Sequence, residues 1–241
     1  MGKHEMTHSL KIKIFADGAS LPGILEMSRN PLISGFTTNP TLMRKAGITD
    51  YEAFAHEALK VVTMLPISFE VFSDEMREME RQALKIAKWG DNVYVKIPST
   101  NTLGESTHGM AARLAQAGVK LNVTAMTTPA HVARMLPALA GGPPAIASIF
   151  AGRVADSGRD PVPLMRECLE LLQTAPNVEL LWASPREVLN LIQANEIGCH
   201  IITMTNDLIS KMTLLGKNLD EFAMDTVKMF RNDAEQAGFH L

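Results

Sequence analysis

The chain has 241 residues, 46% of them hydrophobic and 20% charged, the composition of an ordinary globular protein that can bury a sizeable core. Its formal net charge of −3 argues against a general nucleic-acid-binding protein or a protein of anionic membrane surfaces. No apolar run approaches the roughly 18 residues of a membrane span, and the opening MGKHEMTHSLKIKIF lacks the apolar core of a signal peptide. The spacing of the two cysteines, Cys168 and Cys199, fits no zinc or redox motif, so we expect a reduced, cytoplasmic protein with buried thiols.

Short runs rich in β-forming residues alternate with longer helical patterns along the chain. The predicted strands are 10–17, 32–39, 66–72, 92–98, 119–125, 145–150, 178–184 and 199–204. The predicted helices between them are 51–64, 74–89, 109–118, 129–140, 162–173 and 185–195. This order predicts an α/β protein with the fold of a (β/α)8 TIM barrel, as a single domain over residues 1–241. A further helix is expected at about 218–237, beyond the eighth strand. A doubly wound sheet is the alternative, but no Gly-rich phosphate-binding turn supports it.

Polar residues recur where the predicted strands end. Functional side chains of a (β/α)8 barrel lie at the carboxyl ends of the strands and point inward, and inward positions of one strand share parity. Seven consecutive predicted strands satisfy this demand. Their candidates are Asp17, Thr37 with Asn39, Glu70, Lys96, Asn122 with Thr124, Ser148 with Phe150, and Ser184.

Lys96 is the most informative of these residues. It lies in NVYVKIPST, a β-branched run that is typical of a buried strand. Burial disfavours the charged form of an amine, and an uncharged amine can attack a carbonyl carbon and form a Schiff base. The alternative is a strand-end lysine whose ammonium group reaches into solvent.

At five places the chain resembles the transaldolase and fructose-6-phosphate aldolase family. The matching blocks run in the family's order and are FADGASLPGI with GFTTNPTLM, YVKIPST, LNVTAM, SIFAGRVAD and WASPRE. They span roughly Phe15 to Arg186, and the chain length is similar to that of the family's small branch. The resemblance implies an enzyme of carbohydrate metabolism, in the pentose phosphate pathway.

The resemblance also implies roles for individual residues. Lys96 would form an iminium ion with the C2 ketone of a sugar phosphate, and Asp17 would take the proton of the C4 hydroxyl. Glu70 and Thr124 would hold the water of imine formation and hydrolysis. The remaining candidates would bind substrate: Thr37, Asn39, Asn122, Ser148 and Phe150 around the dihydroxyacetone unit, and Arg153, Ser184 and Arg186 at the phosphate. Ser184, before Pro185, would also cap the seventh helix so that its amides face the anion.

Simpler structural roles remain open for several candidates. Asp17 could cap a turn before Gly18, and Glu70 could pair with a neighbouring cation. The TTNP segment, from Thr37 to Pro40, could serve as a strand-to-helix turn, and Ser148 could simply pack against its neighbours. Arg159 is more typical of a solvated loop. The seven histidines show no metal-ligand spacing, and the imine would already activate the carbonyl, so neither a metal nor another cofactor is implied.

Two features bear on the choice of reaction. Family members that act as aldolases tend to have Tyr and Gln where this chain has Phe150 and Glu70, and Asn122 and Ser148 are also typical of the transaldolase side. We therefore expect transfer of a dihydroxyacetone unit, with fructose-6-phosphate aldolase activity as the alternative and a non-catalytic sugar-phosphate-binding barrel as a weaker one. Loop 99–109 is longer than is usual in the family, overhangs the expected site and could reshape acceptor specificity.

The expected partners are small-molecule sugar phosphates, without nucleic acid or membrane. By resemblance to the small branch, the C-terminal helix should pack on a neighbouring subunit in a ring-like homo-oligomer such as a pentamer or decamer. Its apolar stripe supports this expectation, and includes Leu219, Phe222, Val227 and Phe230. The alternative is that this helix folds back on its own barrel.

Overall fold

Eight parallel strands close into a barrel in the computed structural model, which describes residues 10–240. Each strand pairs with its neighbours in chain order, and β1 pairs with β8, so the predicted (β/α)8 fold is confirmed. The strands are β1 (Lys13–Asp17), β2 (Ile33–Thr37), β3 (Ile67–Glu70), β4 (Val93–Pro98), β5 (Leu121–Met126), β6 (Ala145–Ile149), β7 (Val178–Trp182) and β8 (Ile201–Thr205).

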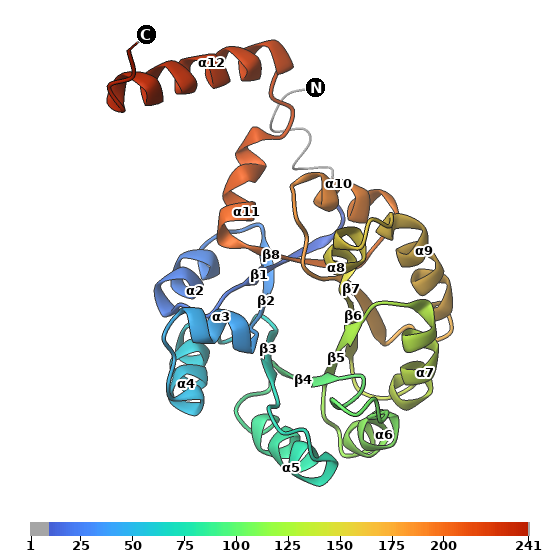
Figure 1. Cartoon of the computed structure of the whole chain (residues 1–241). Helices are drawn as coiled ribbons and strands as arrows, with labels where there is room; N and C mark the ends of the chain where they lie inside the picture. The colour runs from blue at the N-terminus through green and yellow to red at the C-terminus, as the bar shows by residue number, and fades with distance from the viewer. Residues whose placement is uncertain (1–9, 241) are drawn as a thin grey trace. The chain divides into compact units, whose positions relative to one another are not determined.

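Helices surround this barrel (Figure 1). The six predicted between the strands are α4 (Tyr51–Val61), α5 (Met76–Ile86), α6 (His108–Gln116), α7 (Pro129–Leu139), α9 (Pro161–Leu172) and α10 (Leu189–Glu196). The sequence patterns did not indicate the shorter helices α2 (Leu21–Ser28), α3 (Pro40–Lys45), α8 (Ala151–Asp156), α11 (Asn206–Ser210) and the 3-10 turn η1 (Lys211–Leu214).

Three of these helices begin with a polar cap followed at once by proline. The side chains of Asn39, Thr128 and Asp160 accept backbone amides in the first turns of α3, α7 and α9. Proline suits this position because its fixed φ is helical and its missing N–H would have no partner there. Only two residues therefore separate β2 from α3, and Asn39 is held at the carboxyl end of the barrel.

The barrel interior is filled by apolar side chains below its carboxyl end. Phe15, Ile146, Leu181, Ala183 and Ile201 form one buried cluster. Gly35 of β2 makes room for it, because a Cβ atom there would lie 2.5 Å from the ring of Phe15. Phe15 is two residues before Asp17, so the Asp17 carboxylate lies one layer above this apolar cluster.

The chain divides into two compact units, residues 11–209 with the barrel and a second unit that includes residues 210–240. The second unit contains α12 (Leu219–Gln236), the C-terminal helix that the sequence predicted at about 218–237. No residue of α12 is buried. Within residues 10–240, no helix combines the length and apolar character needed to cross a bilayer.

Candidate active site

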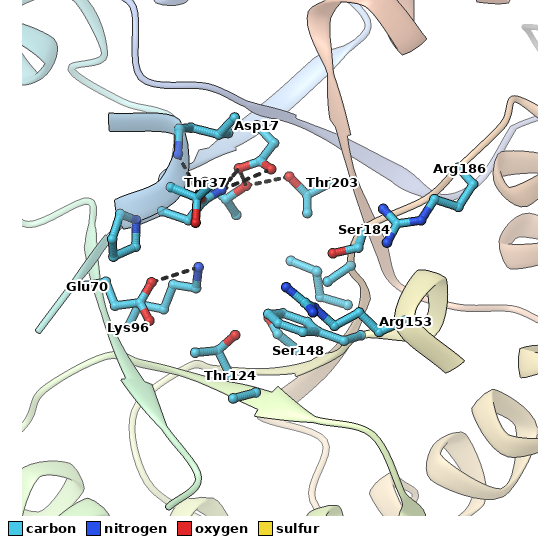
Figure 2. Close-up of a pocket in the computed structure, with 18 residues that line it drawn as sticks. Asp17, Thr37, Glu70, Lys96, Thr124, Ser148, Arg153, Ser184, Arg186 and Thr203 are labelled. Atoms are coloured by element: carbon cyan, nitrogen blue, oxygen red, sulfur yellow. Dashed lines mark hydrogen bonds and ion pairs between the residues drawn. The ribbon is translucent and has the colours of Figure 1, made fainter. Parts of the chain in front are cut away.

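A cavity of about 420 Å³ opens at the carboxyl ends of the strands (Figure 2). Every predicted site residue except Asn122 lines it. The full lining is Asp17, Thr37, Asn39, Pro40, Thr41, Leu42, Glu70, Lys96, Thr124, Ala125, Ser148, Phe150, Arg153, Leu181, Ala183, Ser184, Arg186 and Thr203. The strand-end residues that parity indicated therefore line one cavity, with the exception of Asn122.

The ammonium group of Lys96 is enclosed by oxygen atoms. Lys96 is 7% exposed, and its Nζ lies 3.1 Å from Oε2 of Glu70 and 3.1 Å from the carbonyl oxygen of Thr38. Glu70 and Lys96 are partners in the β3–β4 register, which brings their side chains together. The predicted burial of the lysine is confirmed, and the cation that Glu70 pairs with is Lys96 itself.

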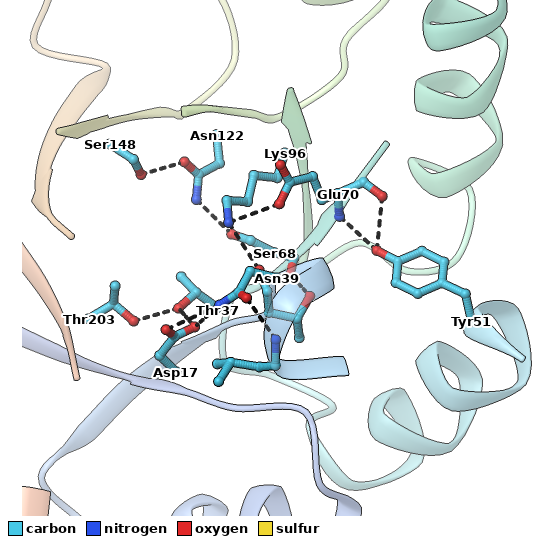
Figure 3. Close-up of polar contacts among 12 residues, drawn as sticks. Asp17, Thr37, Asn39, Tyr51, Ser68, Glu70, Lys96, Asn122, Ser148 and Thr203 are labelled. Carbon is cyan, nitrogen blue, oxygen red and sulfur yellow. Dashed lines mark hydrogen bonds and ion pairs between the residues drawn. The ribbon is translucent and has the colours of Figure 1, made fainter. Parts of the chain in front are cut away.

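A polar cluster surrounds Asp17 at the end of β1 (Figure 3). Thr37 Oγ1 donates to Asp17 Oδ1 at 2.9 Å, and Asn39 Nδ2 lies 3.4 Å from both carboxylate oxygens. Burial raises the pKa of Asp17 above its ordinary value, although the nearby Lys96 and the two hydrogen-bond donors oppose the rise. A carboxyl group with a raised pKa is suited to exchanging a proton with a substrate hydroxyl. The Asn39 Oδ1 atom accepts from Leu42 N, so this residue both caps α3 and lines the cavity.

Thr203 of β8 belongs to the same cluster, and the sequence reasoning missed it. Its Oγ1 lies 2.5 Å from Oγ1 of Thr37, which in turn contacts Asp17. The signal was present, because Thr203 shares parity with buried Ile201 near the exit of the eighth strand.

Thr124 enters the cavity from an irregular stretch of β5. The β5–β6 register shifts between Val123 and Met126, and Ala125 has a φ of 60°. Positive φ is unfavourable for alanine, and strain of this kind is often found at functional sites. The buried hydroxyl of Thr124 has no hydrogen-bond partner among residues 10–240. A buried hydroxyl in this position is available to a substrate or a water molecule.

Asn122 lies below the cavity rather than in its wall. It is completely buried, donates to Ser68 Oγ at 3.0 Å and accepts from Ser148 Oγ at 2.6 Å (Figure 3). Asn122 is the register partner of Lys96, but its side chain is shorter and does not reach the cavity. Its direct contact with substrate therefore remains a prediction, while its contact with Ser148 is a finding.

Two arginines face the cavity from the side opposite Lys96 (Figure 2). The guanidinium of Arg153 lies 5.7 Å from the ring centroid of Phe150. Arg186 contacts Asp156 through Nε at 2.9 Å and through Nη2, and this pairing lowers the pKa of the Asp156 carboxyl. Planar guanidinium groups match the oxygens of a phosphate or carboxylate.

Ser184 lines the cavity in a strained conformation, with a φ of 58°. Its predicted capping role is wrong, because α10 begins at Leu189 with Val188 in the cap position. The carbonyl of Ser184 lies close to Gly152 in the first turn of α8. A Cβ atom on Gly152 would lie 1.6 Å from the carbonyl oxygen of Ser184, so only glycine permits this approach. The amides of Arg186 and Glu187 donate to Asn190 Oδ1.

The long loop 99–109 is pinned to the segment after β3. The Thr102 amide and hydroxyl donate to the Asp74 carboxylate at 2.7 and 2.6 Å, and Thr100 pairs with Ser106. Its residues are not part of the cavity lining, so its effect on acceptor specificity remains a prediction. Arg159 is exposed and also lies outside the lining, as expected of a solvated loop residue.

The arrangement suits the covalent activation of an anionic carbonyl compound. A buried amine lies beside a carboxylate, a second carboxyl with a raised pKa lines the same cavity, and two guanidinium groups line the side opposite the amine. The amine can form an imine, the carboxyl groups can move protons, and the arginines can hold an anion.

Comparison with known proteins finds relatives that match most of the chain. Residues 14–241 match the family model described as Transaldolase/Fructose-6-phosphate aldolase. A "Probable transaldolase" of Dehalococcoides mccartyi is 32% identical over 83% of this chain and 90% of its own length. A "Probable transaldolase 2" of Listeria monocytogenes is 34% identical over 89% and 95%.

Among solved structures, a dihydrodipicolinate synthase from Rhodopseudomonas palustris superimposes with a TM-score of 0.58. The alignment covers 92% of this chain and 79% of that one at 13% sequence identity. At this level of identity the likeness extends to the barrel fold alone.

Proposed function

The chain belongs to the transaldolase/fructose-6-phosphate aldolase family, and we propose that it transfers a dihydroxyacetone unit from a ketose phosphate to an aldose phosphate through an imine on Lys96. The observation that carries the proposal is the position of the Lys96 amine. It is buried in the cavity wall, within 3.1 Å of the Glu70 carboxylate, in a cavity that Asp17 and two arginines also line.

Imine formation begins with attack of the Lys96 amine on C2 of the ketose. The oxygen of that carbonyl must leave as water, and it needs two protons to do so. Glu70 is the nearest carboxyl group to the amine, and it takes two protons in turn from the Lys96 nitrogen and passes them to this oxygen. Thr124 has a hydroxyl without a hydrogen-bond partner among residues 10–240, and this hydroxyl orients the water. The same two residues act in reverse when the imine is hydrolysed.

Cleavage of the C3–C4 bond requires a base for the proton of the C4 hydroxyl. Asp17 takes this proton, and C4 becomes the aldehyde carbon of an aldose phosphate that leaves the site. The electrons of the broken bond move toward the iminium nitrogen, and an enamine of three carbons remains on Lys96. Thr37 and Asn39 hold the carboxylate in place during this step. When an aldose phosphate enters, the enamine carbon attacks its aldehyde and Asp17 returns the proton to the new hydroxyl.

Arg153, Ser184 and Arg186 bind the phosphate of donor and acceptor in this scheme. Their position across the cavity from Lys96 supports it, because a ketose phosphate carries its ketone and its phosphate at opposite ends (Figure 2). Thr37, Asn39 and Ser148 line the cavity between these ends and offer hydrogen bonds to the sugar hydroxyls, and Asn122 supports Ser148 from below.

Fructose-6-phosphate aldolase activity is the second candidate, and Phe150 argues against it. This residue lines the cavity with a ring that carries no hydroxyl. A phenol at this position could order a water molecule that protonates the enamine and releases free dihydroxyacetone. Without it the enamine persists until an acceptor aldehyde arrives, which favours transfer. A non-catalytic sugar-phosphate-binding barrel would have no need of the Lys96–Glu70 pair.

The decisive experiment combines trapping with product analysis. Borohydride added with fructose 6-phosphate should reduce the imine and add a sugar-derived mass to Lys96, located by peptide mass spectrometry. Lys96→Met should lose the adduct and at least about 10³-fold in turnover. Erythrose 4-phosphate should be required for turnover of fructose 6-phosphate. An adduct at another lysine with Lys96→Met still active would refute the mechanism, and acceptor-independent release of dihydroxyacetone would establish the aldolase.

A further inference from the structure

Pairing between β2 and β3 stops before the Lys96–Glu70 pair is reached. The register joins Phe36 to Ile67 and Thr37 to Ser68, and the Thr38 amide donates to the Ser68 carbonyl at 3.2 Å. Parallel strands continue this pattern every second residue. The next two bonds would run from the Glu70 amide to the Thr38 carbonyl and from the amide of residue 40 to the Glu70 carbonyl. Residue 40 is proline and has no N–H to donate.

The hydroxyl of Tyr51 takes both of these missing bonds. It accepts from the Glu70 amide at 2.7 Å and donates to the Glu70 carbonyl at 3.0 Å (Figure 3). Tyr51 is the first residue of α4, so a helix outside the barrel supplies the oxygen atom that satisfies the last backbone hydrogen bonds of β3. A hydroxyl can do this because it is a donor and an acceptor at the same time.

The carbonyl of Thr38 is thereby free for another partner, and that partner is the ammonium group of Lys96 at 3.1 Å. One side-chain oxygen thus fixes two components of the site. It holds the backbone of Glu70, whose carboxylate lies 3.1 Å from Lys96 Nζ. It also replaces the Thr38 carbonyl as partner of the Glu70 amide, so that this carbonyl can accept from the same Lys96 nitrogen.

We propose that Tyr51 is a positioning residue for Lys96 and Glu70, acting through the strand bonds that its hydroxyl replaces. The inference rests on the proposed function, because it assigns Tyr51 a part in the imine chemistry of Lys96. Tyr51 does not line the cavity and is not a catalytic residue.

The surroundings of Tyr51 keep this hydroxyl protonated and in place. Its ring packs edge-on against Phe69 and Phe72, with centroid distances of 6.2 and 4.4 Å, and lies 5.8 Å from Trp89. Burial raises the pKa of the phenol, so it retains the proton that it donates to the Glu70 carbonyl. Phenylalanine at this position would keep the ring contacts and lose both hydrogen bonds.

Kinetics of Tyr51→Phe provide the first test. The turnover number for transfer from fructose 6-phosphate to erythrose 4-phosphate should fall about tenfold, because the amine and carboxylate are no longer held in reacting geometry. KM for fructose 6-phosphate should stay within twofold, since the cavity lining is unchanged. Tyr94→Phe is the matched control, because it removes the same hydroxyl from the chain's only other tyrosine. Tyr94 lies on β4, and its ring contacts Lys120. This control should leave both constants unchanged.

A stability cycle provides a second test, one that needs no activity. In the otherwise unchanged protein, Tyr51→Phe should lower the urea midpoint, because the Glu70 amide and carbonyl lose their partner. In the Lys96→Met background the Thr38 carbonyl is free to accept the Glu70 amide. The same substitution should then lower the midpoint by less than half as much.

The outcomes separate this inference from the proposed function. A tenfold loss of turnover together with the smaller midpoint shift in the Lys96→Met background supports it. Turnover within twofold of the unsubstituted protein, or equal midpoint shifts in the two backgrounds, overturns it. If the unsubstituted protein shows no imine adduct and no turnover, the proposed function fails, and the cycle alone then decides whether Tyr51 positions Lys96.

Discussion

Arg186 is held by Asp156 through two contacts from its guanidinium group, with both side chains about half exposed. The pair orients the guanidinium beside the cavity, but it also occupies donors that a phosphate would use. An exposed ion pair of this kind contributes little energy, so an incoming phosphate can displace or share it.

Arg186→Ala should therefore raise KM for fructose 6-phosphate roughly ten- to a hundredfold, the range expected for losing hydrogen bonds to a charged group. Free dihydroxyacetone as donor should be affected far less, because it carries no phosphate. Asp156→Asn keeps the arginine and should change KM by less than about fivefold. Initial rates for both donors check this, and equal losses for the two donors would remove Arg186 from the phosphate site.

A second prediction concerns Asp17 and pH. Burial raises the pKa of this carboxyl above its ordinary value of 3.8, so the folded protein binds the proton more tightly than the unfolded chain does. The stability that this group contributes is complete below pH 3.8 and is lost as pH rises through the raised value. Asp17→Asn removes this loss. The variant should melt at a higher temperature than the unsubstituted protein near pH 7, with a difference that shrinks toward pH 4.

Asp156→Asn is the control of opposite sign for the melting experiment. Arg186 lowers the pKa of Asp156, so this carboxyl contributes stability above pH 3.8 that disappears as pH falls. In the variant Asp17→Asn the general base is lost, so its turnover should also fall about 10²–10⁴-fold. A melting difference that grows toward low pH would show that the sign of the Asp17 shift is wrong.

The fold was predictable because its signals are local. Each strand and most long helices carry their own hydrophobic pattern, and sequential strands of a (β/α)8 barrel are neighbours in space. The parity of strand-end residues then placed Asp17, Glu70, Lys96 and Thr124 on one cavity. That inference needs only the alternation of side chains along a strand.

The missed features depend on contacts between distant segments. Ser184 does not cap α10, and its carbonyl lies close to Gly152 of α8. Nothing near Ser184 in the sequence indicates that approach. Asn122 has the expected parity, but parity does not say how far a side chain reaches along the barrel axis. Tyr51 is the first residue of a helix, and its contact with Glu70 follows only from the packing of α4.

A third prediction concerns assembly through α12. We propose that this helix packs on another copy of the chain in a ring-like homo-oligomer, because large apolar side chains remain exposed along it: Leu219, Phe222, Met224, Val227, Met229 and Phe230. Phe230→Glu should lower the mass measured by light scattering, because a carboxylate cannot be buried in an apolar contact without a partner. Lys228→Glu, a charged residue on the opposite side of the helix, should leave the mass unchanged. A monomeric full-length protein would contradict the proposal.

The last prediction tests the choice between transfer and cleavage at Phe150. Its ring lines the cavity beside Arg153, and Phe150→Tyr adds one hydroxyl there. A phenol can order a water molecule near the enamine and speed its protonation. Free dihydroxyacetone released from fructose 6-phosphate without acceptor should therefore increase, while transfer to erythrose 4-phosphate decreases. A change in barrier of about 1–3 kcal/mol, the scale of one hydrogen bond, would shift the ratio of the two rates roughly five- to 150-fold.

Phe150→Leu is the control for this substitution, because it alters the packing of the cavity wall without adding a hydroxyl. It should lower both rates together and leave their ratio within about threefold of the unsubstituted protein, since no new proton donor is created. Both rates are measured on the same protein preparation, so a loss of folded protein cancels in the ratio. If Phe150→Tyr and Phe150→Leu change the ratio equally, Phe150 only packs the barrel mouth, and the preference for transfer must arise from other residues around Lys96.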